Sequence, residues 1–263
     1  MTLQKYSASG NDFLIFHTFI KKDYSELAKK YCDRYNGIGA DGLIVLVPIF
    51  PDTKFPETKE GDKKVDIKNV DFEWLFYNSD GSTAAMCGNG ARACALYAYN
   101  NGLSKNSIKF LTGAGIIECY VSYDIVEIAL TKPTEIKEPF SEEGYEWWMV
   151  DTGVPHLVTF VDDLDKFNID IARKLRKKHN SNVNFAKLEN GKLYVRTYER
   201  GVEAETQACG TGMAACFLRA YNLGLVQDVT RVYPKSGELL TMTMKNGILH
   251  FKGPVKKLFS VNI

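Results

Sequence analysis

With 263 residues, 45% of them hydrophobic and 25% charged, the chain is long enough to form two soluble domains, each with its own core. Its net charge of +1 gives no electrostatic reason to expect nucleic acid or a membrane as a partner, and no apolar run approaches the roughly 18 residues of a membrane span. The opening residues, MTLQKYSASGNDF, lack the apolar stretch of a signal peptide, so we expect a cytoplasmic protein with reduced thiols. The six cysteines form no CxxC pair and the four histidines are scattered, so we expect neither a disulfide framework nor a metal site.

The first half of the chain is predicted to combine strands with two helices. Leu27, Tyr31 and Tyr35 recur at the spacing of one helical face, and the apolar run GLIVLVPIF favours a buried strand. The expected elements are strands at 3–9 and 13–20, a helix at 24–35 closed by Gly37, a strand at 42–50, a charged loop at 51–64, strands within 65–77, a helix after Cys87 to about Tyr99, a turn at 111–115 and strands within 116–131.

The second half is predicted to repeat this order. Residues 132–146 are acidic and carry two prolines, so we interpret them as a linker between domains or as the entry to the second copy. The expected elements after it are strands at 147–161, a helix at 169–178 capped by Asp170, strands at 183–198, a second cysteine helix to about Leu223, strands at 229–252 and an edge strand within 255–263.

An eight-residue stretch that occurs twice supports this repetition. Residues 87–94 are CGNGARAC and residues 209–216 are CGTGMAAC, and five of the eight positions agree. Glycines follow both copies at equal distances: Gly102 and Gly115 after Cys87, and Gly224 and Gly237 after Cys209. Such matched spacing indicates one structural unit duplicated within the chain, with a cysteine at the equivalent position of each copy.

We therefore predict an α+β protein of two similar strand-rich domains from an internal duplication, each wrapping a central helix. The domain boundaries are expected at 1–133 and 134–263, with residues 256–263 available as an added strand of the first domain.

Each copy has the composition of a helix that begins directly after a cysteine. The glycines allow a ligand to approach the backbone, and the N–H groups of a first helical turn suit a carboxylate. The same dipole favours a thiolate and can lower a cysteine pKa from about 8.5 to roughly 3.5–7.5. Two such units facing one amino acid would place the sulfurs of Cys87 and Cys209 on opposite sides of its α-carbon. One thiolate could remove the α-proton while the other thiol delivers a proton, which predicts a racemase or epimerase.

Two other functions use the same residues differently. A thiol redox protein would join Cys87 and Cys209 in a disulfide, and a non-catalytic protein on this scaffold would bind an amino acid without exchanging its α-proton. No pyridoxal lysine motif is evident, and GNGARA at 88–93 does not match the dinucleotide pattern G-x-G-x-x-G, so we expect no cofactor. Cys32, Cys94, Cys119 and Cys216 fit ordinary core positions.

Beyond these patterns, the chain resembles the diaminopimelate epimerase family along nearly its whole length. The matching segments, in order, are SASGNDFLIF, NGIGADG, FYNSDGSTAAMCGNGAR, DTGVPH, NVNF and YERGVEAETQACGTG. Related proline racemases usually carry a histidine where this chain has Asn89. The resemblance implies a cofactor-independent epimerase that interconverts L,L- and meso-2,6-diaminopimelate in lysine and peptidoglycan precursor synthesis. It also implies two similar domains that close over this small substrate, and a homodimer.

The resemblance also assigns roles to individual residues. It implies that Cys87 and Cys209 are the acid–base pair and that His156 and Glu199 tune them. It implies a set of residues that bind the substrate through side chains or backbone N–H groups: Asn11, Asn78, Gly88, Asn89, Asn182, Glu199, Arg200, Gly210 and Thr211. Asn180 and Asn184 compete with Asn182 for its role in an asparagine-rich segment. Many members have Gln where this chain has Gly42 and Asn where it has Val154, so neither position is expected to bind the substrate.

Overall fold

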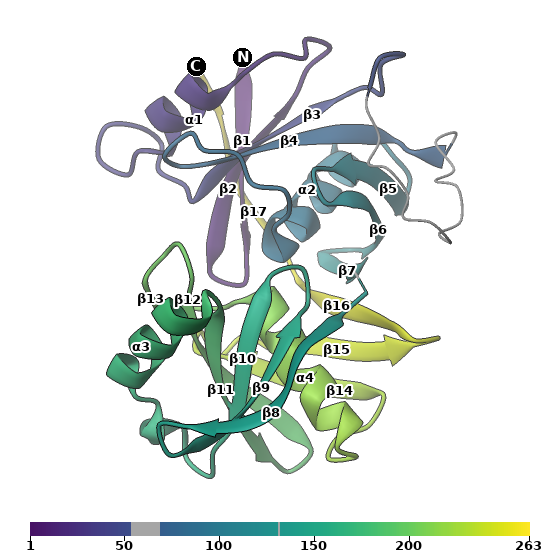
Figure 1. Cartoon of the computed structure of the whole chain (residues 1–263). Helices are drawn as coiled ribbons and strands as arrows, with labels where there is room; N and C mark the ends of the chain where they lie inside the picture. The colour runs from purple at the N-terminus through teal and green to yellow at the C-terminus, as the bar shows by residue number, and fades with distance from the viewer. Residues whose placement is uncertain (54–68, 131) are drawn as a thin grey trace. The chain divides into compact units, whose positions relative to one another are not determined.

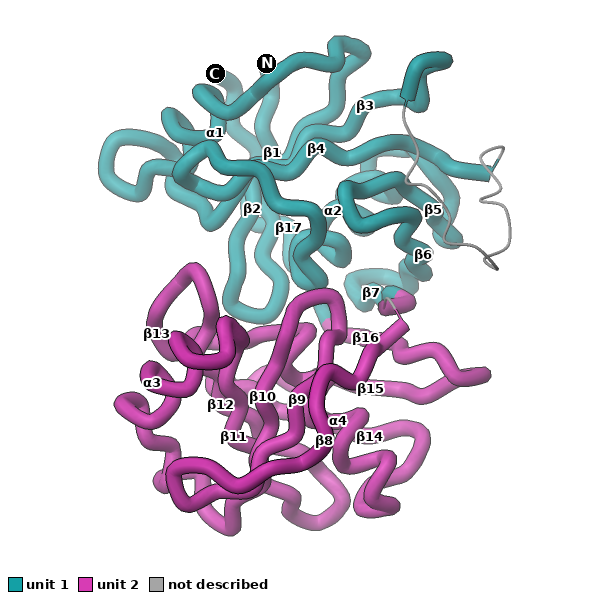
Figure 2. Tube along the Cα trace, viewed as in Figure 1, with its two compact units in different colours: residues 1–128, 254–263 teal, residues 129–253 magenta. Residues whose placement is uncertain are grey.

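A computed structural model describes residues 1–53, 69–130 and 132–263 of the chain. The chain divides into two compact units (Figure 2). Unit 1 comprises Met1–Ile128 and Pro254–Ile263, and unit 2 comprises Ala129–Gly253. Unit 1 is therefore built from two separate segments of the chain. The division falls a few residues before the expected 133/134 boundary.

Unit 1 is a sheet of strands around a central helix (Figure 1). In its described residues, the strands follow one another in the sheet as β17 (Lys256–Asn262), β1 (Thr2–Ala8), β2 (Asn11–His17), β3 (Gly42–Val47), β4 (Phe72–Asn78), β5 (Ser107–Thr112), β6 (Gly115–Ser122) and β7 (Ile125–Ala129). Helix α1 (Ser25–Cys32) connects β2 to β3, and helix α2 (Gly88–Asn100) lies between β4 and β5 in the chain.

Unit 2 is built in the same way. Its strands follow one another as β8 (Thr134–Glu142), β9 (Tyr145–Asp151), β10 (Pro155–Phe160), β11 (Asn182–Glu189), β12 (Lys192–Glu199), β14 (Val229–Pro234), β15 (Leu240–Lys245) and β16 (Ile248–Pro254), and the short β13 (Ala204–Glu205) also pairs with β12. A 3-10 turn, η2 (Leu164–Lys166), and helix α3 (Ile169–His179) connect β10 to β11, and helix α4 (Gly210–Asn222) precedes β14.

The two units share one topology, which confirms the predicted α+β fold with an internal duplication. In both, the successive strand pairs are antiparallel, antiparallel, parallel, antiparallel, parallel, antiparallel and antiparallel. Helices α1 and α3 bridge the first parallel pair, and α2 and α4 bridge the second. In this correspondence β17 takes the place that β8 has in unit 2, although it comes last in the chain.

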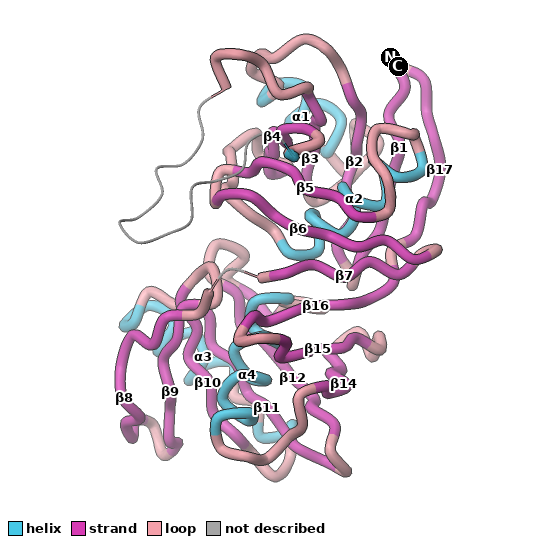
Figure 3. Tube along the Cα trace, turned by 90° about the vertical axis from the view of Figure 1, so that its right-hand side faces the viewer, coloured by secondary structure: helices cyan, strands magenta, loops and turns pink. Residues whose placement is uncertain are grey.

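Both central helices are buried and consist mostly of small or apolar residues, although α2 also buries Asn89 and Arg92. In α2 the side chains from Gly88 to Ala98 are all buried, and the helix packs against β1, β2 and β6. Helix α4 packs against β9 to β12 and against β14 and β15 (Figure 3). A helix that is apolar around its circumference belongs inside a core.

Several expected elements end differently in the structure. The helix predicted at 24–35 stops at Cys32, because the Asp33 carboxylate accepts hydrogen bonds from the N–H groups of Tyr35 and Asn36 at 2.7 and 2.6 Å and so forms a turn. Asp170 does not cap α3. Asn168 does, since its Oδ1 accepts from the N–H groups of Asp170 and Ile171.

Residues 132–146, predicted to be a linker or the entry to the second copy, form mostly strand at the start of unit 2. Residues 134–142 form β8, whose side chains are almost all exposed, and Pro139 lies where the pairing with β9 shifts register. An exposed edge strand tolerates charge and proline at such a position. Strand β5 was not predicted at all. Most of the charged loop at 51–64 and the start of the strands expected within 65–77 lie outside the described residues.

Within the described ranges, no helix is long and apolar enough to cross a membrane.

Candidate active site

Cys87 is the N-cap residue of α2. Its sulfur accepts a hydrogen bond from the backbone N–H of Gly90 at 3.4 Å, and its side chain is only partly buried. The helical ladder starts with the Ala91 N–H bonded to the Cys87 carbonyl, so the N–H groups of Gly88 and Asn89 have no acceptor within the helix. The thiol thus lies beside the positive end of the helix dipole and beside backbone donors that suit an anion.

Cys209 is the N-cap of α4, with different surroundings. Its side chain is 7% exposed, and its sulfur lies 3.6 Å from the hydroxyl oxygen of Thr211 rather than within reach of a capping N–H. The Thr152 hydroxyl donates to the Thr211 carbonyl at 2.8 Å, which fixes the backbone of this first turn. Gly210 has no space for a side chain, because a Cβ there would lie 2.9 Å from the Phe251 ring.

The other four cysteines are core residues, as the sequence predicted. Cys94 and Cys216 are fully buried within α2 and α4, Cys32 is the buried last residue of α1, and Cys119 is buried in β6. Burial raises the pKa of all four thiols, in the case of Cys32 to about 12. These thiols are therefore protonated at neutral pH and unsuited to proton abstraction.

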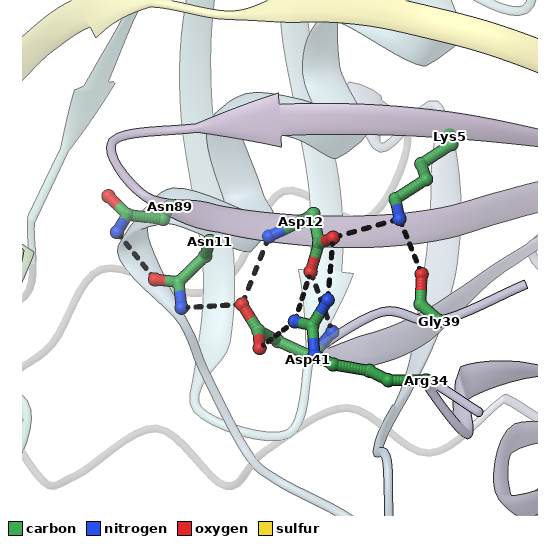
Figure 4. A network of polar contacts seen from close by, with 7 residues as sticks. All are labelled: Lys5, Asn11, Asp12, Arg34, Gly39, Asp41 and Asn89. Carbon is green, nitrogen blue, oxygen red and sulfur yellow. Dashed lines mark hydrogen bonds and ion pairs between the residues drawn. The ribbon is translucent and has the colours of Figure 1, made fainter. Parts of the chain in front are cut away.

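In unit 1, Asn11 and Asn89 contact each other through their amides (Figure 4). Asn89 donates from Nδ2 to the Asn11 Oδ1 at 2.8 Å, and Asn11 donates from Nδ2 to an Asp41 carboxylate oxygen at 2.9 Å. The guanidinium of Arg92, fully buried, donates to the Asn89 Oδ1 at 2.8 Å and to the Ser9 hydroxyl at 2.6 Å. Because a carboxylate only accepts and a guanidinium only donates, the orientation of both amides is fixed.

The Asp41 carboxylate belongs to a wider ion-pair network, also drawn in Figure 4. Arg34 contacts both Asp12, at 2.8 and 3.2 Å, and Asp41, at 2.7 Å. Lys5 pairs with Asp12 at 2.9 Å and donates to the Gly39 carbonyl. Burial would raise the pKa of Asp12, but hydrogen bonds from Arg34 and Lys5 hold that pKa below its ordinary value. The network joins the turn that carries Asn11 to the loop after α1.

In unit 2, His156 lies on β10 in register with Asn182 of the parallel strand β11. Its Nε2 lies 2.9 Å from the Thr211 hydroxyl and 3.3 Å from the Asn182 Nδ2, and its Nδ1 lies 3.1 Å from the Asn184 Nδ2. Burial lowers the pKa of His156 to about 3, and the charge of Arg200 acts in the same direction. The ring is thus neutral at physiological pH and contacts the first turn of α4 through Thr211.

Asn182 and Arg200 are also close neighbours. The Asn182 Oδ1 accepts from the Arg200 backbone N–H at 2.7 Å, and the Arg200 guanidinium donates to the Asn180 carbonyl at 3.0 Å. Glu199 is the last residue of β12, directly before Arg200, and pairs across the strand with Ala204. The three asparagines of this segment therefore have different partners. The backbone carbonyl of Asn180 accepts from the Arg200 guanidinium, the Asn182 side chain accepts from the Arg200 backbone, and the Asn184 side chain contacts His156.

Asn78 lies in a different turn of unit 1, at the end of β4, and its amide donates to the Ser82 hydroxyl at 3.0 Å. It pairs across the sheet with Gly42. A Cβ at Gly42 would lie 2.6 Å from the Phe76 ring, so this ring occupies the space that a side chain at position 42 would need. Val154 is partly buried between β9 and β10 and offers no polar side-chain atom.

The structure adds polar residues that the sequence did not single out. Asp41, Arg92 and Thr152 each lie inside a matched segment, namely NGIGADG, CGNGAR and DTGVPH, but nothing in composition distinguishes them from residues of a turn or helix. Each half of the duplication thus presents a thiol at a helix N-terminus, supported by buried amides. A thiol and a backbone anion cradle are the groups needed to move a proton at the α-carbon of an amino acid.

Comparison with known proteins gives a consistent result. The family model described as diaminopimelate epimerase matches residues 3–133 and 148–258. A diaminopimelate epimerase of Nitratiruptor sp. is 55% identical, with 98% of this chain and 97% of that protein covered, and one of Campylobacter lari is 50% identical, with 100% and 98% covered. Among solved structures, a probable proline racemase of Agrobacterium radiobacter has a TM-score of 0.73 at 11% identity, covering 100% of this chain and 92% of that one. That last likeness is one of fold.

Proposed function

Because the chain belongs to the diaminopimelate epimerase family, we propose that it interconverts L,L- and meso-2,6-diaminopimelate by proton transfer between two cysteines, Cys87 and Cys209, without a cofactor. Membership of this family makes the protein an isomerase of the epimerase class. The proposal concerns its substrate, its mechanism and the residues that carry them.

In the proposed reaction, one sulfur is a thiolate and the other a thiol. The thiolate takes the proton of the substrate α-carbon, and the electron pair of the broken C–H bond spreads into the neighbouring carboxylate. The opposite thiol then gives its proton to the other face of the same carbon. The configuration is inverted, and the two sulfurs have exchanged protonation states. No oxidant or other reactant is consumed.

The backbone N–H groups at the start of both helices stabilise the charge that develops. We propose that those of Gly88 and Asn89, and of Gly210 and Thr211, bind the reacting carboxylate. Donors that are already oriented towards a developing negative charge are typically the largest single contribution to such a reaction. The observation that carries the proposal is that Cys87 and Cys209 are N-cap residues of equivalent helices in a duplicated unit.

The far end of the substrate requires a second set of residues. We propose that Asn11, Asn78, Asn182, Glu199 and Arg200 bind the distal amino and carboxylate groups, with Arg200 forming a forked pair with the carboxylate. His156 and Glu199 adjust the cysteine chemistry. His156 acts as a neutral ring, since burial lowers its pKa to about 3.

A single experiment distinguishes this proposal from the two alternatives. The protein is incubated with L,L-diaminopimelate in heavy water, and the products are analysed for α-deuterium and for the meso isomer. The epimerase produces both. Peroxide or dithiol turnover without isotope exchange would indicate a thiol redox protein instead, and binding without exchange would indicate an amino-acid-binding protein.

We further propose that the reaction supplies lysine and peptidoglycan precursor synthesis in the cytoplasm, and that the protein is a homodimer. These proposals rest on the family alone. Sedimentation equilibrium of the purified protein tests the dimer, and the location is tested by fractionating cells and assaying epimerase activity.

A further inference from the structure

A chain of hydrogen bonds in unit 2 leads from a backbone carbonyl of β10 to the sulfur of Cys209. It passes through the side chains of Asn184, His156 and Thr211. The direction of each bond can be derived, because one end of the chain is a group that can only accept. The inference deepens the proposed function, on which it rests for the role of Cys209.

The Asn184 amide is held in one orientation. It is fully buried, its Nδ2 donates to the Leu157 carbonyl at 2.8 Å, and its Oδ1 accepts from the Thr197 hydroxyl at 2.9 Å. Turning the amide over would place two acceptor oxygens, Oδ1 and the Leu157 carbonyl, against each other. Since a carbonyl cannot donate, Nδ2 must face Leu157, and its second hydrogen is directed at the Nδ1 atom of His156 at 3.1 Å.

This contact determines the tautomer of His156. Burial lowers its pKa to about 3, so the ring carries one N–H at neutral pH. A hydrogen on Nδ1 would point at the Asn184 donor, so the hydrogen is on Nε2. Nε2 then donates to the Thr211 hydroxyl, 2.9 Å away.

The Asn182 amide also approaches Nε2, but it does not reverse this assignment. Its Nδ2 is 3.3 Å from Nε2, which is longer than the 3.1 Å contact of Asn184 with Nδ1. The same Nδ2 has another acceptor, the Pro155 carbonyl at 3.3 Å. Both amides are held in one orientation, Asn182 by the Arg200 N–H, so the shorter contact of Asn184 decides the assignment.

Thr211 completes the chain. Its oxygen accepts from the His156 Nε2–H, so its own hydrogen is available for donation, and the Cys209 sulfur lies 3.6 Å away. A hydroxyl hydrogen directed at a sulfur favours the thiolate over the thiol. Helix α4 is packed closely onto this arrangement. A Cβ at Gly212 would collide with the Asn184 Oδ1 and would lie 3.1 Å from the Thr197 hydroxyl.

We propose that Asn184 is a positioning residue for the reaction: through the Nε2–H tautomer of His156 it directs the Thr211 hydroxyl at Cys209 and so stabilises the thiolate of that cysteine. His156 contributes its orientation and its hydrogen, and carries no charge. Three charged or titratable groups lie near this series of hydrogen bonds. They are Arg200, whose charge acts on His156, Glu199 beside it in sequence, and Cys216, which is buried with a raised pKa.

The first test is the tautomer itself, measured by nitrogen NMR of the imidazole rings in the resting protein. One-bond coupling to hydrogen identifies the protonated nitrogen, and the His156→Gln variant identifies the resonances that belong to His156. We expect the ring to carry a single hydrogen, on Nε2, at every pH between about 6 and about 8. A hydrogen on Nδ1, or on both nitrogens, would overturn the proposal.

The second test is the pH dependence of alkylation of Cys209 by iodoacetamide, read by peptide mass spectrometry. Cys87 in the same sample is the internal control. Thr211→Val removes the hydroxyl at nearly constant shape, and we expect the thiolate fraction of Cys209 at a given pH to fall about tenfold, with Cys87 unchanged. Thr211→Ser should restore the wild-type curve. An unchanged Cys209 curve in Thr211→Val would refute the role of the hydroxyl.

Asn184→Asp tests the other end of the hydrogen-bond chain, opposite Cys209. A carboxylate at this site accepts where the amide donated, so the hydrogen should move to the Nδ1 atom of His156 and the Cys209 curve should shift as in Thr211→Val. If this variant does not fold, the tautomer of the wild-type protein decides the question alone. None of these measurements uses substrate, so an absence of epimerisation by the wild type would refute the proposed function and leave the hydrogen-bond chain to be judged separately.

Discussion

Cys87 and Cys209 begin equivalent helices, but their sulfurs contact different groups: a backbone N–H of Gly90 at 3.4 Å for Cys87, and the hydroxyl of Thr211 at 3.6 Å for Cys209. A backbone N–H can only donate, so it favours the thiolate at Cys87. A free hydroxyl can donate to a thiolate or accept from a thiol, but in the proposed hydrogen-bond chain the Thr211 oxygen already accepts from His156, so its hydrogen is directed at the Cys209 sulfur. The duplication has thus preserved the position of the thiol and changed its environment.

Replacing either cysteine alone should abolish epimerisation. Two faces of one carbon require two proton-transfer groups, and one sulfur cannot reach both. We expect Cys87→Ala and Cys209→Ala each to lose at least about a hundredfold in turnover of diaminopimelate, since a positioned acid or base typically contributes 10² to 10⁴. Cys94→Ala and Cys216→Ala, at the buried cysteines of the same helices, are the matched controls and should remain active. Near wild-type turnover in either of the first two variants would contradict the two-base mechanism.

Mild oxidation without substrate should inactivate the protein reversibly. If both sulfurs approach one carbon during the reaction, a small movement can bring them within bonding distance. We expect a Cys87–Cys209 disulfide by peptide mapping and recovery of activity with dithiothreitol. The buried thiols of Cys94 and Cys216 should stay reduced. An inactivated protein in which Cys87 and Cys209 are both still thiols would count against this geometry.

Arg200 should determine selectivity for the distal carboxylate. The reacting centre must accept both configurations, so discrimination has to come from side chains at the far end of the substrate. We expect L-lysine, which lacks the distal carboxylate, to be a very poor substrate, because a charged group left unpaired in a closed site is costly. Arg200→Ala should lose diaminopimelate turnover while keeping its circular dichroism spectrum. Comparable rates on the two substrates, or an unimpaired variant, would show that specificity lies elsewhere.

Gly212 and Gly90 occupy equivalent positions, which provides a matched pair of substitutions. A Cβ at Gly212 would collide with the Asn184 amide, whereas at Gly90 the nearest atom would be the Cys87 Cβ at 3.3 Å. We expect Gly212→Ala to lower the free energy of unfolding by about 1–3 kcal/mol through overpacking. Gly90→Ala should be nearly neutral, because the better helix propensity of alanine, about 1 kcal/mol, offsets a mild contact. Urea unfolding of both variants measures this, and an equal cost would mean that the Asn184 side chain can shift freely.

His156 should make the protein sensitive to acid. Its pKa is about 3 when folded, below the value of about 6.5 expected when unfolded, so the unfolded state binds the extra proton first. The stabilising effect is complete above about pH 6.5 and is lost as the pH falls from there towards 3, by at most about 1.4 kcal/mol per pH unit. We expect His156→Gln to show a shallower loss of unfolding free energy between pH 6 and pH 4 in urea titrations. Parallel curves for the two proteins would mean that the ring is protonated in the folded state.

The repeated cysteine stretch made most of the fold predictable. Matched glycines after Cys87 and Cys209 indicated a duplication, and the structure shows the same order of strand pairs in both units. Strand β5 was missed because Thr112, Gly113 and Gly115 form a strong turn signal, and the strand lies directly before it. Strand β8 was missed because an exposed edge strand has the charge and proline content of a linker.

The support around the thiols could not be predicted in the same way. His156 lies beside Asn182 and Asn184 only because β10 and β11 pair in parallel with one particular register. The pairing of Asn11 with Asn89 likewise depends on where the β1–β2 turn meets the first turn of α2. Such contacts join residues far apart in the chain, and a single sequence carries no signal for their register.

The position of β17 has a consequence for synthesis on the ribosome. Unit 2 is a continuous segment and can fold as soon as residues 129–253 have emerged, whereas β1 has no outer neighbour until residues 254–263 follow. The half of the protein that is translated first is thus the half that is completed last. Until then the buried Arg92 also lacks the Pro254 carbonyl to which it donates at 3.0 Å. A nascent chain stalled shortly after residue 253 would therefore expose the edge of β1 to other chains.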